Sequence, residues 1–333
     1  MEIAIVGAGI AGVTCGRQLH AGGAHVSLYE KSRGAGGRMA TRRTADGLRF
    51  DHGAQYFTLR DRRFLAAAEA WKQTGLIARW TGTIVEISSA GTIDKTNDER
   101  FVAVPAMNAL CKHLAEGLSV QTQAHVGRLE PHEKRWELFS TEGDSLGTAD
   151  WVISSAPAGQ TAALMRPSQG IVQAASVAEM LPCWGVMIAP TEPLDAAAFD
   201  GAFVNTGPLR WVARNSSKPG REAGQETWVL HASAEWSNTH WEKPPEWIAQ
   251  NLWETFCQLL ELDYPSKTAF QTAHRWRYAL VDSAFSERFV IDPQLQLAAC
   301  GDWCGGPRVE GAYLSGLEVA EQLLQTLSRK AEI

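Results

Sequence analysis

This sequence has no long apolar run and no excess of basic residues, and each absence excludes a class of protein. No apolar stretch approaches the roughly 18 residues that a membrane-spanning helix needs. The 333 residues carry a formal net charge of −6, whereas a nucleic-acid-binding protein shows a basic stripe. We therefore expect neither a membrane protein nor a nucleic-acid partner.

Cysteine and histidine are present but too scattered to indicate a metal site. None of the six cysteines forms a CxxC pair, and the nine histidines include no HExxH motif. The acidic Glu2 and the early apolar run do not fit a signal peptide, so we expect a cytoplasmic protein with reduced thiols. No metal cofactor is expected.

What the sequence does contain is clearest at its start. An apolar run, Met1–Val6, leads into GAGIAG (Gly7–Gly12), and Glu30 closes the next apolar run. This order is typical of the βαβ unit that wraps an adenine dinucleotide, with the pyrophosphate at the helix N-terminus. A carboxylate about 20 residues beyond the glycines accepts ribose hydroxyls and disfavours a 2′-phosphate. FAD or NAD therefore fits better than NADP.

Three later segments have the composition of cofactor loops. Lys31–Thr41 combines glycines with Arg33 and Arg38, so its backbone can lie against a ligand and its arginines can meet phosphate. Phe50–Phe57 places small residues beside polar and aromatic ones. Near the C-terminus, Gly301-Asp302 precedes an amphipathic helix. We expect the Asp302 carboxylate to accept hydrogen bonds from polyol hydroxyls and the N-terminus of the helix to face a flavin ring.

The rest of the chain reads as alternating helices and strands. We predict helices over about 64–71, 105–118, 246–262 and from 309, strands near 78–87, 183–189, 228–234 and 295–300, and a meander of 120–130, 135–141 and 151–157. Residues 215–221 read as a polar loop. Eight of the thirteen tryptophans lie between Trp184 and Trp276, which suggests a wide, aromatic-lined pocket for a flat ligand.

Taken together, these features resemble the flavoprotein group that includes amine oxidases and phytoene desaturases. More narrowly, the sequence is similar to the renalases, especially bacterial ones. The similarity rests on six stretches: Lys31–Ala40, Asp51–Thr58, Trp211–Pro219, His231-Ala232, His274–Tyr278 and Gly301–Gly316. It implies non-covalent FAD, since the tyrosine-containing cysteine motif of covalently flavinylated monoamine oxidases is not present around Cys304.

The resemblance also implies the fold class. We expect an α/β protein in which a Rossmann-like FAD-binding domain interleaves with an α+β substrate domain containing a mixed or antiparallel sheet, as in p-hydroxybenzoate hydroxylase and monoamine oxidase. The FAD-binding domain would comprise residues 1–59, 101–160 and 286–333, and the substrate domain 60–100 and 161–285. The protein would be a monomer or a weak homodimer.

The implied activity is the oxidation of aberrant dihydro isomers of NAD(P)H, with the hydride at ring position 2 or 6. These small molecules would give a hydride to flavin N5, and O₂ would take the electrons, leaving β-NAD(P)⁺ and hydrogen peroxide. This would be metabolite repair. Such a transfer needs no proton removed by the protein, so catalysis is mostly the placement of one ring over another.

Site residues follow from the motifs and the resemblance. The expected cofactor contacts are Gly7, Gly9, Ile10, Ala11, Gly12, Glu30, Lys31, Arg33, Gly37, Arg38, Met39, Gly53, Ala54, Gln55, Tyr56, Val126, Gly301, Asp302, Val309, Glu310, Gly311 and Ala312. The expected catalytic face is His231, Trp276, Arg277 and Tyr278, and the expected contacts to substrate ribose or phosphate are Arg214, Asn215 and Lys218.

Two other functions compete with this one. An amine oxidase or a desaturase shares the cofactor fingerprint, and an amine oxidase commonly uses a lysine-held water near flavin N5. Lys218, Lys243 and Lys267 are the lysines between residues 151 and 329, and prolines beside them predict exposed turns. The third possibility is a non-catalytic flavin or nucleotide sensor.

Overall fold

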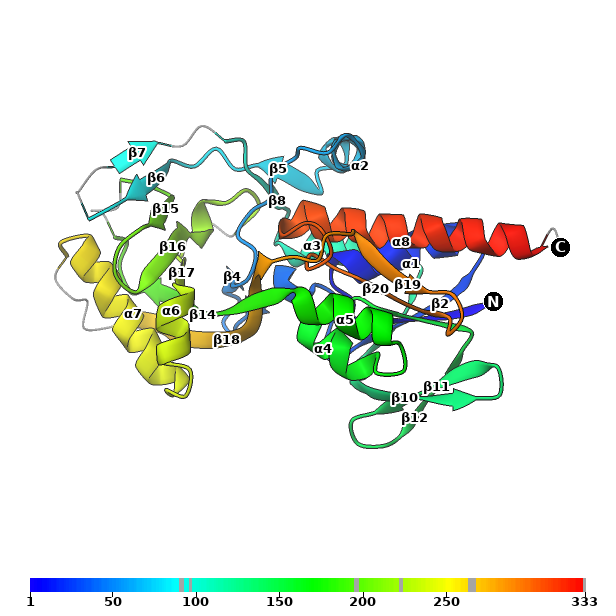
Figure 1. Ribbon diagram of the computed structural model, residues 1–333. Helices are drawn as coiled ribbons and strands as arrows, with labels where there is room; N and C mark the ends of the chain where they lie inside the picture. Colours follow the sequence, from blue (N-terminus) through cyan, green and yellow to red (C-terminus); the bar gives the residue numbers. More distant parts are fainter. Residues whose placement is uncertain (90–92, 96–97, 195–197, 222–223, 263–267, 332–333) are drawn as a thin grey trace.

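The chain forms two lobes, each built on one large sheet, and two long strands run from one lobe to the other (Figure 1). The computed structural model describes residues 1–333 except 90–92, 96–97, 195–197, 222–223, 263–267 and 332–333. Lys267, one of the lysines considered above, lies outside the described residues. Both termini lie at the same end of the molecule.

The first lobe contains a six-stranded sheet in the order β19-β20-β13-β1-β2-β9. Its strands are β1 (Glu2–Val6), β2 (His25–Glu30), β9 (Ser119–Thr122), β13 (Trp151–Ser154), β19 (Phe289–Asp292) and β20 (Leu297–Cys300). All neighbours are parallel except β19, which pairs antiparallel with β20. Alternate residues of β1, β13 and β20 pack in two different core clusters, so these strands are buried on both faces, as parallel strands usually are.

Helices α1 (Ile10–Ala21) and α8 (Arg308–Ala331) lie side by side along this sheet, so the two ends of the chain pack together (Figure 1). They approach closely at Gly316, where a Cβ atom would collide with the carbonyl oxygen of Ala11. Helix α3 (Asn108–Leu114) packs nearby and is shorter than predicted, because the chain turns at Ala115 and Leu118 lies beyond its end.

The meander is present, but the prediction of its third strand was wrong, and the predicted first strand is divided because Ser119–Thr122 forms β9 of the six-stranded sheet. It consists of β10 (Val126–His132), β11 (Arg135–Ser140) and β12 (Ser145–Ala149). Trp151–Ser154 instead forms β13, between β1 and β20 in the parallel sheet. The whole of β13 is buried, whereas β12 alternates with exposed residues, as a strand with one solvated face does.

The second lobe contains a seven-stranded sheet in the order β18-β14-β17-β16-β15-β6-β7. Its strands are β6 (Ile84–Ile87), β7 (Ile93–Lys95), β14 (Glu179–Pro190), β15 (Gly201–Val204), β16 (Leu209–Arg214), β17 (Trp228–Ala232) and β18 (Thr268–Ser283). Helices α6 (Ala234–Thr239) and α7 (Pro245–Leu259) cover one face, with Trp184, Trp228 and Trp253 in the core between them. Several of the clustered tryptophans are therefore core residues.

Smaller elements join the lobes. They are the 3₁₀ turns η1 (Gly37–Met39) and η2 (Asn215–Ser217), the pairs β3 (Thr41–Arg43) with β4 (Arg49–Asp51) and β5 (Ile77–Arg79) with β8 (Phe101–Ala103), and helices α2 (Arg62–Gln73), α4 (Ala158–Leu164) and α5 (Gln169–Val177). Helices α4 and α5 share a core with the six-stranded sheet, so the first lobe extends to Val177.

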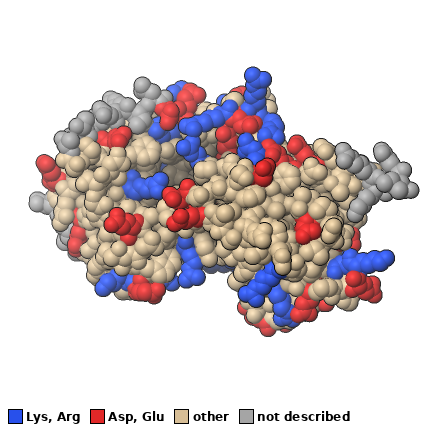
Figure 2. All heavy atoms as spheres, viewed as in Figure 1, with Lys and Arg blue, Asp and Glu red and all other residues tan. Residues whose placement is uncertain are grey.

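The visible surface mixes charges of both signs, with Lys and Arg interspersed among Asp and Glu (Figure 2). Among the described residues, no helix is both long and apolar enough to cross a bilayer. The same part of the chain contains no group of three or more His, Cys, Asp or Glu residues arranged to hold a metal ion.

Candidate functional site

The glycine-rich turn between β1 and α1 has the geometry of a phosphate cradle. Gly7 has a φ of 104°, which favours glycine, and a Cβ at Gly12 would collide with the Gly7 carbonyl oxygen. Gly9 is the N-cap of α1 and offers no side-chain cap, so the first backbone N–H groups of the helix, including those of Ile10 and Ala11, are left for a ligand.

Glu30 lies at the end of β2, beside this turn. One of its carboxylate oxygens accepts a hydrogen bond from the Ala8 backbone N–H at 2.9 Å, and the other accepts from the Ser32 N–H at 2.8 Å. Val126 is buried near the same strand end, in one core with Tyr29. Lys31 and Arg33 are exposed on the loop that follows.

The loop that follows β2 reaches back to the glycine turn and across to the C-terminal segment. Gly37 lies so close to Gly9 that a Cβ there would be 3.1 Å from the Gly9 Cα. Arg38 donates two hydrogen bonds of 2.6 Å to the Asp302 carboxylate, and its Nη1 lies 3.5 Å from the Ala279 carbonyl oxygen on β18. This loop therefore joins three segments that are far apart in the sequence.

The C-terminal residues surround the start of α8. The Gly301 N–H donates to the Ser315 hydroxyl at 2.8 Å, and a Cβ at Gly311 would collide with the Gly306 carbonyl oxygen. Val309 and Ala312 are buried in the same turn. The Glu310 side chain points elsewhere, since its carboxylate accepts the backbone N–H groups of Arg60 and Asp61 before α2. Met39 is also directed inward, towards the Cys111 thiol.

A row of rings crosses the face of the seven-stranded sheet that α6 and α7 do not cover. Cross-strand pairing places Phe203, Trp211, His231, Gly185 and His274 next to one another on β15, β16, β17, β14 and β18. Paired residues of neighbouring strands project to the same face of a sheet. This row and Trp276, two residues beyond His274, are called the ring face below.

The loop after β4 packs on the ring face. The His52 carbonyl oxygen accepts hydrogen bonds from His231 Nε2 at 3.1 Å and Trp276 Nε1 at 3.0 Å. A Cβ at Gly185 would lie 3.0 Å from this oxygen, so glycine there lets the loop approach the sheet. A Cβ at Gly53 would collide with the Arg38 carbonyl oxygen, which accepts a hydrogen bond from the Ala54 N–H at 2.8 Å. These contacts connect the ring face to the loop that carries Arg38.

The imidazoles at the ring face are neutral. Burial lowers the pKa of His231 to about 4, and burial together with the neighbouring His274 lowers that of His52 to about 4. Burial, followed by the charge of Arg42, also lowers the pKa of His274. Since a carbonyl oxygen only accepts, His231 carries its proton on Nε2. The rings are therefore flat, uncharged surfaces near neutral pH.

Lys218 lies in a buried polar network beside this loop, so the prediction that it occupies an exposed turn was wrong. Its ammonium Nζ lies 3.0 Å from Gln55 Oε1 and 3.2 Å from Asn215 Oδ1, and 3.7 Å from an Asp51 carboxylate oxygen. Arg221 donates to the same carboxylate at 2.5 and 3.2 Å. Local sequence gave no sign of this, because Gln55 is 163 residues from Lys218.

Opposing effects set the charges in this network. Burial, with a smaller contribution from Arg221, lowers the pKa of Lys218 to about 7 against the opposing effect of Asp51. For Asp51, burial alone would raise the pKa, but Lys218, Arg221 and their hydrogen bonds outweigh it and the pKa is lowered. Asp51 is thus ionised, and Lys218 can exist with or without its proton near neutral pH.

An aromatic group adjoins the network. Tyr56 lies 5.5 Å from the Trp211 ring and 6.5 Å from Trp80, measured between ring centroids. The guanidinium of Arg100 lies 5.1 Å above Tyr56, and Lys218 Nζ lies 5.6 Å from the Trp80 ring. The Trp211 indole Nε1 finds no hydrogen-bond partner within the described part of the chain.

Not all of the expected residues come together. Arg277 is exposed on the opposite face of β18 from Trp276, 5.8 Å above the Trp241 ring, because alternate residues of a strand point to opposite faces. Arg214 likewise lies on the helix-covered side, above Trp228 and near Glu226. Tyr278 shares the Trp276 side, and its hydroxyl packs near Gly159.

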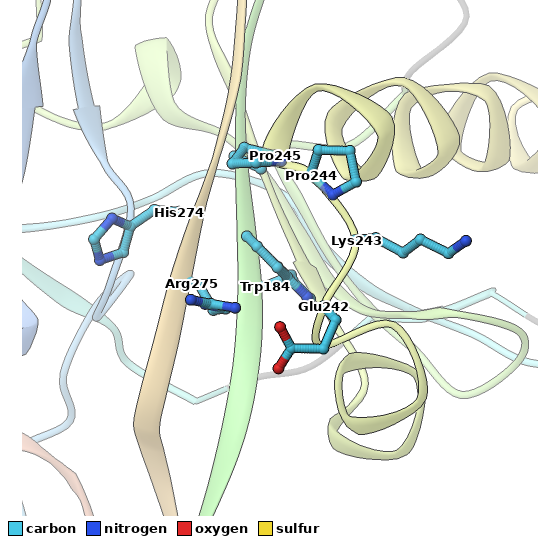
Figure 3. Close-up of a pocket in the computed structure, with 8 residues that line it drawn as sticks. Trp184, Glu242, Lys243, Pro244, Pro245, His274 and Arg275 are labelled. Atoms are coloured by element: carbon cyan, nitrogen blue, oxygen red, sulfur yellow. The ribbon is translucent and has the colours of Figure 1, made fainter.

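A separate cleft of about 540 Å³ lies beside that other face, lined by Trp184, residues 242–245 and 273–275. Figure 3 shows Arg275 and His274 on opposite sides of β18, so the cleft and the ring face are separated by the strand. Arg275 is held in place, because Nη1 donates to the Trp241 carbonyl at 2.9 Å and the guanidinium covers the Trp241 ring.

Sequence reasoning missed several residues of the site: His52, His274, Trp211, Gly185, Asp51 and Arg221. Two of these, His52 and Asp51, lie in the segment 50–57 that was recognised as a cofactor loop, and Trp211 and His274 lie in stretches that carry the resemblance. Arg221 had no signal, since an arginine after Pro219-Gly220 reads as part of a solvated turn.

The donor set fits a flavin adenine dinucleotide. The N-terminus of α1 has no side-chain cap, so its N–H groups can bind a pyrophosphate, and the close approach of Gly37 to Gly9 leaves little room for a side chain at Gly37. Glu30 at the end of β2 suits ribose hydroxyls, and Arg38 and Asp302 connect this region to the ring face through residues 53–54.

Comparison with known proteins agrees with this geometry. A family model described as flavin containing amine oxidoreductase matches residues 90–324, and one described as an NAD(P)-binding Rossmann-like domain matches residues 5–70. Three solved structures cover 98% of this chain and 99% of their own. A candidate protoporphyrinogen oxidase from Exiguobacterium sp. 255-15 has a TM-score of 0.79 at 10% identity. Cyclohexylamine oxidase from Brevibacterium oxydans IH-35A has 0.76 at 13%, and putrescine oxidase bound to putrescine has 0.72 at 15%. At these identities the structural likeness shows the fold alone.

Proposed function

Because this chain belongs to the family of flavin-containing amine oxidoreductases, we propose that it is an oxidase of the 2- and 6-dihydro isomers of NAD(P)H. The family identifies the protein as an FAD-dependent oxidoreductase, and our proposal concerns the identity of its substrate. Bound FAD would accept the hydride at N5 and pass two electrons to O₂, so that the products are β-NAD(P)⁺ and hydrogen peroxide. This is the renalase reaction, and its role would be metabolite repair.

The observation that carries the proposal is the chemistry of the ring face. A dihydropyridine that loses a hydride becomes an aromatic cation and gives no proton to the protein, so the site needs flat surfaces to orient the ring. Trp211, the neutral His231 and the stacked pair of His52 and Trp276, whose ring centroids lie 5.1 Å apart, supply such surfaces. Within the described residues of the ring face, no carboxylate stands ready to act as a base.

A specific observation favours a second candidate, an amine oxidase. Lys218 is buried, and its pKa of about 7 leaves a neutral fraction that could hold a water or accept a proton from a substrate ammonium. Two solved structures with the same fold carry the names of amine oxidases, for cyclohexylamine and putrescine. The ring face favours the dihydropyridine, and the experiment below decides between them.

The decisive measurement is anaerobic mixing of the purified yellow protein with an equilibrated mixture of NADH isomers. We expect rapid bleaching of the flavin by a minor fraction of the mixture and little bleaching by pure β-NADH. Bleaching by cyclohexylamine or putrescine, without any by the isomers, would establish the amine oxidase instead. A protein that binds FAD but is reduced by neither class would be a sensor.

A matched pair of variants tests the ring face. Trp276→Leu removes a ring that is fixed to the His52 carbonyl, so bleaching should slow by roughly tenfold or more through lost placement. Trp247→Leu removes an exposed ring on α7 and should leave the rate unchanged. Equal rates in both variants would contradict a role for the ring face.

A further inference from the structure

Strand β18 is the outer strand of the seven-stranded sheet, and among the described residues it pairs with β14 alone. From Phe270 to Trp276 this pairing is regular, with no register shift. Along such an edge, every second residue directs its backbone N–H and C=O groups away from the sheet. The strand contains no proline, so each of its residues keeps the N–H donor that a further strand would need. The outer side of residues 270–277 is called the β18 edge below.

The side chains beside the β18 edge are basic. Arg275 and Arg277 are exposed on the face opposite the ring face, and residues 268–281 include no acid. The Trp241 carbonyl accepts from Arg275 Nη1 at 2.9 Å, and the two guanidinium groups lie 4.7 and 5.8 Å from the centroid of the Trp241 ring. Neither forms an ion pair with a described residue. Since a guanidinium has five N–H donors, both arginines keep donors for an anion from outside.

The cleft of about 540 Å³ lies along the same stretch of β18. Ala273 and Arg275 line it from the strand, and Trp184 with residues 244–245 adds apolar surface. The lining residues include one acid, Glu242, on the same side of β18 as Arg275 (Figure 3). An apolar side chain therefore suits the part of the cleft beside Ala273, where an acidic one would meet Glu242.

We propose that the β18 edge binds an extended, acidic segment of a partner protein, which adds to the sheet as a further strand. Such a strand places alternate side chains on the face that carries Ala273, Arg275 and Arg277. Two acidic residues spaced two apart would meet the arginines, and an apolar residue two further along would enter the cleft at Ala273. Main-chain hydrogen bonds supply the affinity in this mode of recognition, and the side chains supply the specificity. The β18 edge is separate from the ring face, so the inference does not depend on the proposed function.

Charge favours an acidic partner over a second copy of this chain. Two copies paired antiparallel about Trp276 would place Arg275 of one protomer opposite Arg277 of its partner, and the reverse. Like charges directly opposite each other on neighbouring strands are destabilising. An acidic strand brings unlike charges together at the same positions, and the exposed guanidinium groups are already oriented by the Trp241 ring.

Fluorescence anisotropy of the holoprotein with labelled peptides tests this recognition. The probe Thr-Val-Thr-Glu-Thr-Glu-Thr-Val-Thr reads the same in both directions, so it fits either strand orientation. A control peptide of the same composition has its glutamates adjacent, which sends them to opposite faces of the strand. We expect the probe to bind roughly threefold more tightly or better, because the control peptide keeps only one of the two ion pairs. Equal affinities, or no binding of the probe, overturn the proposal.

Charge reversal tests the two arginines. Arg275→Glu and Arg277→Glu should each weaken binding of the probe roughly fivefold or more, and each should favour a probe with lysine in place of glutamate. Arg166→Glu, at an exposed arginine after α4, should change neither affinity. If Arg275→Glu does not fold, Arg277→Glu carries the test, since the hydrogen bond to the Trp241 carbonyl comes from Arg275.

Amide hydrogen exchange tests the added strand itself. Saturation of the holoprotein with the probe should slow exchange in residues 270–277, because outward N–H groups become paired. Binding without this protection would mean contact through side chains alone. A dimer in sedimentation that Arg277→Glu dissociates would mean that a second copy occupies the β18 edge. Either result overturns the proposal.

Discussion

Lys218 shows how one side chain acquires its properties from residues that are remote in the chain. In the sequence it precedes proline within a polar stretch, yet its ammonium is enclosed by Gln55, Asn215 and Asp51. Asp51 and Arg221 form a buried ion pair, and burying either charge without the other would be costly. The pKa of about 7 for Lys218 follows from this enclosure.

This lowered pKa makes a prediction about stability. The unfolded chain binds a proton at Lys218 below about pH 10.5, whereas the folded protein does so only below about 7. Between these values the unfolded state holds more protons, so this lysine makes the unfolding free energy rise with pH and fall as pH drops towards 7. Lys218→Met should reduce the slope by up to about 1 kcal/mol per pH unit.

Urea unfolding of both proteins between pH 7.5 and 10 measures this slope. Lys134→Met, at an exposed hairpin turn, serves as the control and should leave the slope unaltered. Parallel curves for Lys218→Met and the unaltered protein would show that Lys218 is charged throughout the range.

Asp302 illustrates a second residue-scale effect. Its carboxylate accepts both hydrogen bonds of the Arg38 guanidinium, and the pair is only partly exposed. Asp302→Asn removes the charge that orients Arg38, and hydrogen bonds to charged groups are worth about 1.5–3 kcal/mol. We expect the dissociation constant of FAD to rise roughly tenfold or more. Equilibrium dialysis measures this constant.

The matched control for this variant is Glu130→Gln, which removes the carboxylate of an exposed arginine pair on β10. Surface pairs of this kind contribute little. If Asp302→Asn and Glu130→Gln retained FAD equally well, the Arg38–Asp302 pair would have no part in holding the cofactor.

At the scale of elements, the close approach of α1 and α8 requires a small residue at Gly316. Gly316 faces the backbone of Ala11, so any side chain would push the two helices apart. Gly316→Ala should therefore lower stability by about 1–3 kcal/mol, as overpacking does. Gly170→Ala on α5 has open space around its Cβ and should be neutral or stabilising by up to about 1 kcal/mol.

Thermal unfolding of both glycine variants separates packing from helix propensity. The two substitutions are chemically identical and both lie within helices, so a difference in Tm reports the contact at Ala11 alone. A melting temperature for Gly316→Ala at or above that of Gly170→Ala would contradict the close approach.

Elements also show what the sequence could and could not predict. The turn Gly7–Gly12, Glu30 and the terminal helix carry local signals, because their conformations require particular residues, and the α/β fold follows from them. The third strand of the meander was wrong because Trp151–Ser154 and Ser145–Ala149 are adjacent strands of similar length. Only the choice of pairing partner, which is made by tertiary packing, assigns one to the meander and the other to the parallel sheet.

The same distinction applies to the candidate site. The expected cofactor residues come from contiguous motifs, which a single sequence displays. The ring face and the Asp51 network arise from cross-strand register, so Trp211 and His231 become neighbours through pairing that no local pattern encodes. Period-two alternation does explain why Arg277 leaves the Trp276 side, and that part of the prediction could have been made from the strand itself.

At the scale of the whole molecule, the site draws on both ends of the chain and on both lobes. Gly9 and Glu30 come from the start, Asp302 from the end, and the ring face from the second lobe. A ligand held by all of them adds its binding free energy to the stability of the folded state, which amounts to about 2.7 kcal/mol at a concentration of one hundred times Kd. The assignment of residues 1–59, 101–160 and 286–333 to an FAD-binding domain, and of residues 60–100 and 161–285 to a substrate domain, stays a prediction.

Removal of FAD should therefore lower the melting temperature by roughly 5 °C, since proteins of about 150–250 residues lose about 2–4 °C per kcal/mol and a larger protein loses less. In the holoprotein, release of flavin fluorescence and loss of far-ultraviolet circular dichroism should share one midpoint, because neither lobe can unfold without dismantling the site. Readdition of FAD to the apoprotein should restore the higher midpoint, and Asp302→Asn should need more FAD to do so. Flavin release well below the unfolding of the chain would instead mean that the cofactor is held by one lobe alone, with the other free to open independently.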